Sequence, residues 1–125
     1  MSLCLAAGAI SAVFAIESFT LSWIHSIEKI RWEEDWRIDA GGLVIDEARI
    51  RGTGAGMEPP AGAVLKDGAW HYRPAVPPQP VLRLAHSPHA AAYTLCTATL
   101  CAALADYLPG LPGNATLEIY ACGEK

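Results

Sequence analysis

The stretch IRWEEDWRI, residues 30–38, decides the fold that this sequence predicts. Its even-numbered positions are apolar apart from Glu34, and its odd-numbered positions are all charged. A period of two residues is typical of a β-strand that buries one face. A helix would also bring Trp32 and Trp36 together, but it leaves Ile30 and Ile38 off a single stripe. Because tryptophan and isoleucine also favour strands, we predict a strand here.

Glu34 is the exception in this alternation, because it falls on the side of the tryptophans. An unpaired carboxylate is costly to bury in a dry core. Three arrangements would avoid that cost: a cation such as Arg49 pairs with Glu34, the strand has a bulge or ends at a sheet edge there, or the side chain lines a cavity. We favour the bulge or sheet edge, while the cavity is the arrangement with functional content.

The flanking sequence predicts further strands joined by turns. FTLSW (19–23) alternates in the same way, and DAGG (39–42) predicts a turn into a second strand. Asp67-Gly68 suits a type I′ hairpin turn, and RPAVPPQP (73–80) predicts an extended connector. The remaining predicted elements are strands in 43–50, 81–85, 93–100 and 115–122 and a short helical turn within 101–114. The predicted fold is an all-β, single-domain β-sandwich or small barrel of about seven or eight short antiparallel strands.

The length and charge of the chain limit its class. With 125 residues it is long enough for one domain with a real core. Its formal net charge of −4 argues against a nucleic-acid partner. It also has no polybasic run that would hold an anionic membrane surface.

Residues 1–16, MSLCLAAGAISAVFAI, contain no charged side chain. This run is shorter than the about 20 apolar residues of a transmembrane helix, and it fits the hydrophobic region of a secretory signal, although no basic region precedes it. We therefore expect residues 1–15 to be a signal-like or anchoring apolar segment that precedes a β domain at 16–125. The alternative is a buried first strand or short helix.

The four cysteines suggest one disulfide bond. Cys96 and Cys101 flank TATL, a spacing that can close across a β-hairpin, and an oxidising compartment would favour that bond. Cys4 lies within the signal-like segment. Cys122 is then left over, either buried and reduced or as an alternative partner.

The adjacent His25 and Ser26 suggest catalysis only at first sight. Neighbouring residues in a strand point to opposite faces, so the pair cannot form a nucleophile–base hydrogen bond while the chain is extended. A turn could bring them together, and Glu28 could then orient His25. We favour a structural polar cluster at the rim of the sheet.

Two other patterns resemble binding motifs and are weaker. His86 and His89, with His71, form a conceivable metal set, but a solvated Ser-Pro loop explains HSPH better. GTGAGM (52–57) lacks the lysine and the helix of a phosphate-binding loop, so a tight turn is favoured. We expect neither a metal nor a cofactor.

Taken together, four motifs resemble one small bacterial family of unknown function: FTLSWIHSIEKIRWEEDW, GAGM, DGAWHYRP and YTLC…C. Members of that family are usually encoded beside TAXI-type TRAP transporters, which are sodium-coupled importers fed by a periplasmic binding protein. The motifs of the family fall here on His25, Ser26 and Glu28, and on the loop of Gly54, Ala55, Gly56 and Met57. The resemblance covers residues 19 to about 101.

The resemblance implies an exported β domain, periplasmic or anchored to the outer face of the inner membrane. It implies a transporter accessory, with no established activity, whose partners are the TRAP transporter membrane subunits or the solute-binding protein. Our leading hypothesis is a non-enzymatic accessory or binding module. The seven motif residues would form its binding rim, in contact with a transporter subunit or with a small ligand of unknown identity. The alternative is a small hydrolase or metal-dependent enzyme that uses His25 with Glu28.

Overall fold

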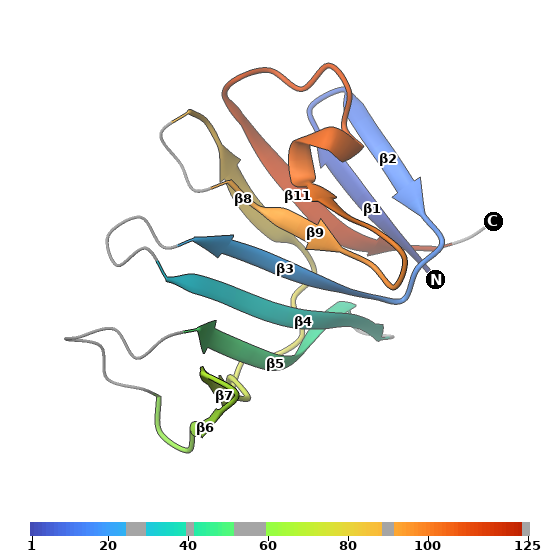
Figure 1. Cartoon of the computed structure of the whole chain (residues 1–125). Coiled ribbons are helices and arrows are strands. Elements are labelled where there is room, and N and C mark those ends of the chain that lie inside the picture. The colour runs from blue at the N-terminus through green and yellow to red at the C-terminus, as the bar shows by residue number, and fades with distance from the viewer. Residues whose placement is uncertain (25–29, 40–41, 52–59, 89–91, 124–125) are drawn as a thin grey trace.

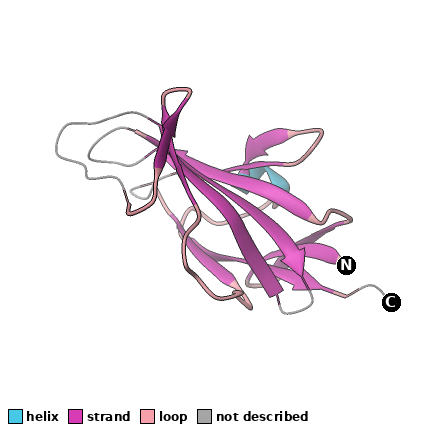
Figure 2. Ribbon diagram, turned by 90° about the horizontal axis from the view of Figure 1, so that it is seen from below, coloured by secondary structure: helices cyan, strands magenta, loops and turns pink. Residues whose placement is uncertain are grey.

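The computed structural model describes residues 1–24, 30–39, 42–51, 60–88 and 92–123. Within these ranges the chain forms eleven strands and one short 3-10 helix. The elements are β1 (Ser2–Ala7), β2 (Ile10–Phe14), β3 (Ser18–Ile24), β4 (Arg31–Asp39), β5 (Gly42–Arg51), β6 (Val64–Lys66), β7 (Ala69–Tyr72), β8 (Leu82–His86), β9 (Thr94–Cys96), β10 (Cys101–Ala103), η1 (Leu104–Tyr107) and β11 (Ala115–Cys122). Seen from below, the molecule consists of strands and loops, with the helical turn in cyan (Figure 2).

The strands form two antiparallel sheets that lie as two layers (Figure 1). The smaller sheet has the order β2-β1-β11-β8, and the larger has the order β10-β9-β3-β4-β5-β7-β6. Their facing sides share one apolar core, to which the smaller sheet contributes Leu3, Leu5, Leu117 and Ile119. The all-β prediction is confirmed, and the sheets form a sandwich rather than a closed barrel.

The strand predicted at the outset is confirmed as β4. Its neighbours are β3 and β5, and Trp36 is buried opposite Phe19. Both residues belong to the core between the sheets. The even-numbered residues of β4 therefore face inward, as the alternation predicts, and a helix is excluded.

The predicted strand count is too low. The described residues form eleven strands rather than seven or eight, because β1, β2 and β10 were not expected. Residues 93–103 form two short strands joined by a turn, and β1 and β2 come from the segment that we expected to stand apart.

The N-terminal segment lies within the sandwich. β1 is paired with β2 on one side and β11 on the other, and Leu3 and Leu5 are fully buried. The absence of charge in residues 1–16 is as typical of a central strand buried on both faces as it is of a secretory signal. A buried first strand is the alternative given in the sequence analysis. The predicted division of the chain at residue 15 and the export of the protein both stay predictions. No helix in the described ranges has both the length and the apolar character needed to cross a membrane.

The structure tests the predicted hairpin turn at Asp67-Gly68 and the predicted disulfide bond. Asp67 and Gly68 have φ angles of 53° and 77°, which confirms the hairpin turn. The predicted bond between Cys96 and Cys101 is confirmed, and these residues lie opposite each other in β9 and β10. Cys122 pairs with Cys4 and so links β11 to β1.

Candidate functional site

The predicted rim residues lie outside the described residues. They are His25, Ser26, Glu28, Gly54, Ala55, Gly56 and Met57. The strand ends that lead to them are described, however, and they are neighbours: Ile24 pairs with Arg31, and Arg31 pairs with Arg51. The chain therefore enters both motifs from the same end of the neighbouring strands β3, β4 and β5.

A row of large apolar side chains crosses the inner face of the larger sheet near this end of the strands. Trp23 of β3 pairs with Trp32 of β4. Trp32 pairs in turn with Ile50 of β5, and Ile50 pairs with Trp70 of β7. Tyr93, just before β9, packs against Trp23. We call these five residues the aromatic row.

Three rings of the aromatic row, those of Trp23, Trp32 and Tyr93, form two contacting pairs. The indoles of Trp23 and Trp32 stack with their centroids 6.3 Å apart and their planes at 21°. The ring of Tyr93 lies 5.5 Å from that of Trp23, tilted by 51°. Such pairs add about 0.5–1.5 kcal/mol to the stabilisation from burial alone.

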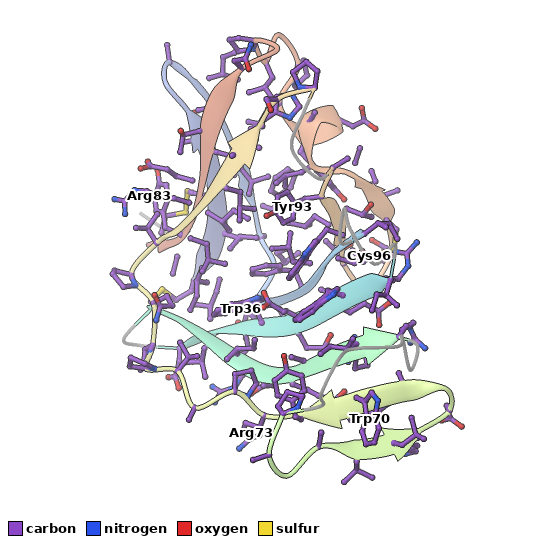
Figure 3. The ribbon with its side chains drawn as sticks, turned by 90° about the vertical axis from the view of Figure 1, so that its left-hand side faces the viewer. Trp36, Trp70, Arg73, Arg83, Tyr93 and Cys96 are labelled. Atoms are coloured by element: carbon purple, nitrogen blue, oxygen red, sulfur yellow. A yellow bond between two sulfur atoms is a disulfide. The ribbon has the colours of Figure 1, made fainter. Side chains whose placement is uncertain are left out.

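The row lies at the margin of the core rather than at its centre. Trp23 and Tyr93 pack against the core cluster, whereas Trp32 and Trp70, both only partly buried, are outside it among the described residues. Beside Trp70 on the same face, Leu65 of β6 is 49% exposed. Figure 3 views the molecule from this end and shows Tyr93 between the two sheets and Trp70 on the β6–β7 hairpin. Solvent therefore reaches part of the row.

Glu34 lies two residues after Trp32 in β4 and therefore on the same inner face of the sheet. It is partly buried, in regular pairing with Leu21 and Ala48, and the Trp36 Nε1–H donates a hydrogen bond of 3.0 Å to its Oε1. The expected bulge or sheet edge at Glu34 is wrong. The register shift lies between Asp35 and Trp36, and β4 is a central strand.

The environment of Glu34 disfavours its charge. Burial raises the pKa of its carboxyl group, although the hydrogen bond from Trp36 opposes this shift. The pKa values of the Tyr72 and Tyr93 hydroxyls are raised by burial and, in second place, by the negative charge of Glu34. The carboxylate is therefore electrostatically coupled to two tyrosines on this face.

The suggested cation Arg49 does not neutralise Glu34. Arg49 lies on the outer face of the sheet, where it donates two hydrogen bonds of 2.7 and 2.8 Å to Asp35. It also binds Glu33 at 2.8 Å and Glu47 at 2.7 Å. Among the described residues, no lysine, arginine or histidine forms an ion pair with Glu34.

The outer ion network holds its carboxylates in the charged form. Hydrogen bonds from Arg49 lower the pKa values of Asp35 and Glu47. Burial alone would raise the pKa of Glu33, but hydrogen bonds from Arg49 and Arg51 lower it. Arg49 is only 14% exposed and already bonds three carboxylates, so this network is structural rather than an anion site.

The candidate metal set does not assemble from its described members. His71 lies in β7 of the larger sheet and contacts Glu47, whereas His86 lies in β8 of the smaller sheet. His89 is outside the described residues. In the described part of the chain, no three His, Cys, Asp or Glu side chains are placed to hold a metal ion.

A pocket of about 400 Å³ lies beside the outer face, away from the aromatic row. It contains two carboxylates, those of Asp35 and Asp46, and both are engaged by arginines: Arg49 binds Asp35 and Arg37 binds Asp46. Its lining residues are Ser18, Phe19, Thr20, Asp35, Trp36, Asp46, Cys96, Thr97 and Ala98. Because its charged groups already have partners, we place the candidate site at Glu34 and the aromatic row instead.

Sequence reasoning found part of this site. The alternation singled out Glu34, Trp23 and Trp32, but the binding role was predicted for the motif residues at 25–28 and 54–57, on the basis of the family resemblance. It missed Trp70 and Tyr93, although each falls on the inward parity of a predicted strand. For Trp70, the sequence signal is its position two residues after the predicted Asp67-Gly68 hairpin turn.

Comparison with known proteins gives one family. A family model described as a domain of unknown function (DUF1850) matches residues 19–104, more than half of the chain. The match contains the whole aromatic row and Glu34, and it leaves out β1, β2 and β11. A search of curated proteins found no match, and neither did a search of solved structures.

Proposed function

Since the chain belongs to the DUF1850 family, whose matched region includes Glu34 and the aromatic row, we propose that it is a non-enzymatic binding module with its binding surface at this site. The observation that carries the proposal is a carboxylate on the core-facing side of a central strand, beside partly exposed rings, with no cation partner among the described residues. Such an arrangement costs stability, and proteins keep costly polar groups mainly where they function.

We also propose that the module is exported and serves a TAXI-type TRAP transporter. The resemblance of its motifs supports this partner. The two disulfide bonds, which engage all four cysteines, support an oxidising compartment. The module would then act in the periplasm or at the outer face of the inner membrane, on a membrane subunit or on the solute-binding protein.

The test is co-purification of the tagged protein with its transporter from bacterial membranes. Trp32→Leu removes one ring of the stacked pair while keeping an apolar side chain on β4. We expect the recovered transporter to fall about tenfold, which corresponds to about 1.4 kcal/mol of binding free energy. Thermal unfolding of the purified variant checks that the fold is retained.

Val13→Ser is the matched control, because Val13 is 65% exposed on β2 of the other sheet. It should leave recovery unchanged. Glu28→Ala tests the rim motif and should also reduce recovery. Unchanged co-purification in Trp32→Leu would refute the proposed binding surface.

A further inference from the structure

The chemistry at Glu34 selects the charge of what binds there. Its carboxylate has one hydrogen-bond donor among the described residues, the Trp36 indole, and this donor is neutral. An incoming cation would restore the ion pair that the described residues do not supply. In this partly desolvated setting an ion pair is stronger than on an open surface.

The aromatic row selects the shape of that cation. Trp23 and Trp32 present flat rings whose planes differ by only 21°, and Tyr93 continues the row. The faces of such rings attract cations, tryptophan most strongly. A guanidinium group is planar, stacks on aromatic rings and matches a carboxylate with a fork of donors, whereas an ammonium group is a compact, strongly hydrated point charge.

The exposure of the row indicates that the cation is carried by a partner. Trp32 and Trp70 are themselves only partly buried, and Leu65, which lies opposite Trp70 on the same face, is 49% exposed. Leu65 therefore extends the row with apolar surface that a protein segment would cover. The net charge of −4 also favours a basic partner.

We propose that Glu34 and the aromatic row bind the guanidinium group of an arginine side chain presented by a partner protein. This inference rests on the proposed function and names the chemical group that it recognises. The guanidinium group stacks on the indoles and donates hydrogen bonds to the Glu34 carboxylate. The surrounding apolar residues contact the partner segment that carries the arginine.

The test uses the purified full chain and two small probes. N-acetyl-arginine amide carries the guanidinium group, and N-acetyl-citrulline amide has nearly the same shape without the charge. Each is titrated while the indole N–H signals are followed by two-dimensional NMR. We expect the arginine probe to shift the signals of Trp23 and Trp32 with an affinity about tenfold or more above that of the citrulline probe.

Two variants separate this site from a general attraction of cations to an acidic protein. Glu34→Gln should lower the affinity for the arginine probe about tenfold. Glu118→Gln is the control, because Glu118 is a carboxylate of the other sheet that pairs with Arg83 at its surface. It should leave the affinity unchanged.

Equal binding of the two probes, or unchanged binding in Glu34→Gln, would overturn the assignment. Equal binding of tetramethylammonium would overturn the choice of guanidinium. If the probes give such a negative result but Trp32→Leu still loses co-purification, the proposed binding module is supported and only the proposed guanidinium ligand is wrong. Arginine-selective binding with unchanged co-purification would instead remove the proposed transporter partner.

Discussion

Glu33 and Glu34 are neighbours in β4, yet their carboxyl groups meet opposite environments. Glu33 faces outward to Arg49 and Arg51, and its pKa is lowered. Glu34 faces inward to the Trp36 indole, and burial raises its pKa. The period of two residues in a strand is the whole cause of this contrast. One carboxylate contributes to stability at neutral pH, whereas the other reduces it.

This contrast predicts opposite effects of removing each charge. Glu34→Gln should raise the melting temperature at pH 7 by about 4 °C, which corresponds to roughly 1 kcal/mol in a chain of this size. Because the pKa of Glu34 is raised in the folded state, the protonated side chain contributes stability at pH values below the ordinary pKa of 4.5. That contribution is lost as the pH rises through the folded-state pKa. The gain should therefore disappear in acid, as thermal unfolding at several pH values will show.

Glu33→Gln is the matched control, since it alters the adjacent residue on the other face. The pKa of the Glu33 carboxyl group is lowered in the folded state, so its charged form contributes stability at pH values above the ordinary pKa of 4.5. That contribution is lost as the pH falls through the folded-state pKa. The variant should melt below the wild type at pH 7. A lower melting temperature for Glu34→Gln at pH 7 would contradict the cost assigned to its carboxylate.

Among the elements, β5 links the larger sheet to the connector that leads to β8. Leu43 and Gln79 exchange two backbone hydrogen bonds of 2.8 Å, so the connector is held against the start of β5. Gly42 precedes this contact with a φ of +130°, and a Cβ atom there would lie 2.6 Å from the Gln79 carbonyl oxygen. Only glycine fits this approach of two backbones without a shift.

Gly42→Ala should therefore destabilise the protein by more than about 1 kcal/mol, because the clash adds to an unfavourable φ. Unfolding in urea will measure the loss. Gly113→Ala is the control, since no atom lies within 4 Å of its built Cβ and its φ is not in the left-handed region. Equal midpoints for Gly42→Ala and the wild type would show that the connector does not hold β5 as described.

At the scale of the whole molecule, the two disulfides close loops of very different size. Cys4 and Cys122 are separated by 118 positions and join the first strand to the last. Cys96 and Cys101 are separated by 5 and close one hairpin. By chain entropy, the long loop contributes about 5 kcal/mol and the short loop about 2 kcal/mol.

Removal of the two bonds should reflect this difference. The double variant Cys4→Ser with Cys122→Ser should melt well below the variant Cys96→Ser with Cys101→Ser, because the first releases β1 from the end of the chain. Circular dichroism during heating measures both transitions. Equal losses, or a greater loss for the hairpin bond, would contradict the role of β1 as an integral strand.

The sequence by itself determined the all-β class, the β4 strand, the Asp67-Gly68 hairpin and the Cys96–Cys101 bond. These features depend on alternation and short spacing, which are local properties of the chain. Only the tertiary structure decided that residues 2–14 complete a sheet, that Cys4 bonds Cys122, and that Arg49 pairs away from Glu34. Each of these depends on which distant strands become neighbours, and an apolar run or a lone charge is compatible with several such pairings until the sheets pack.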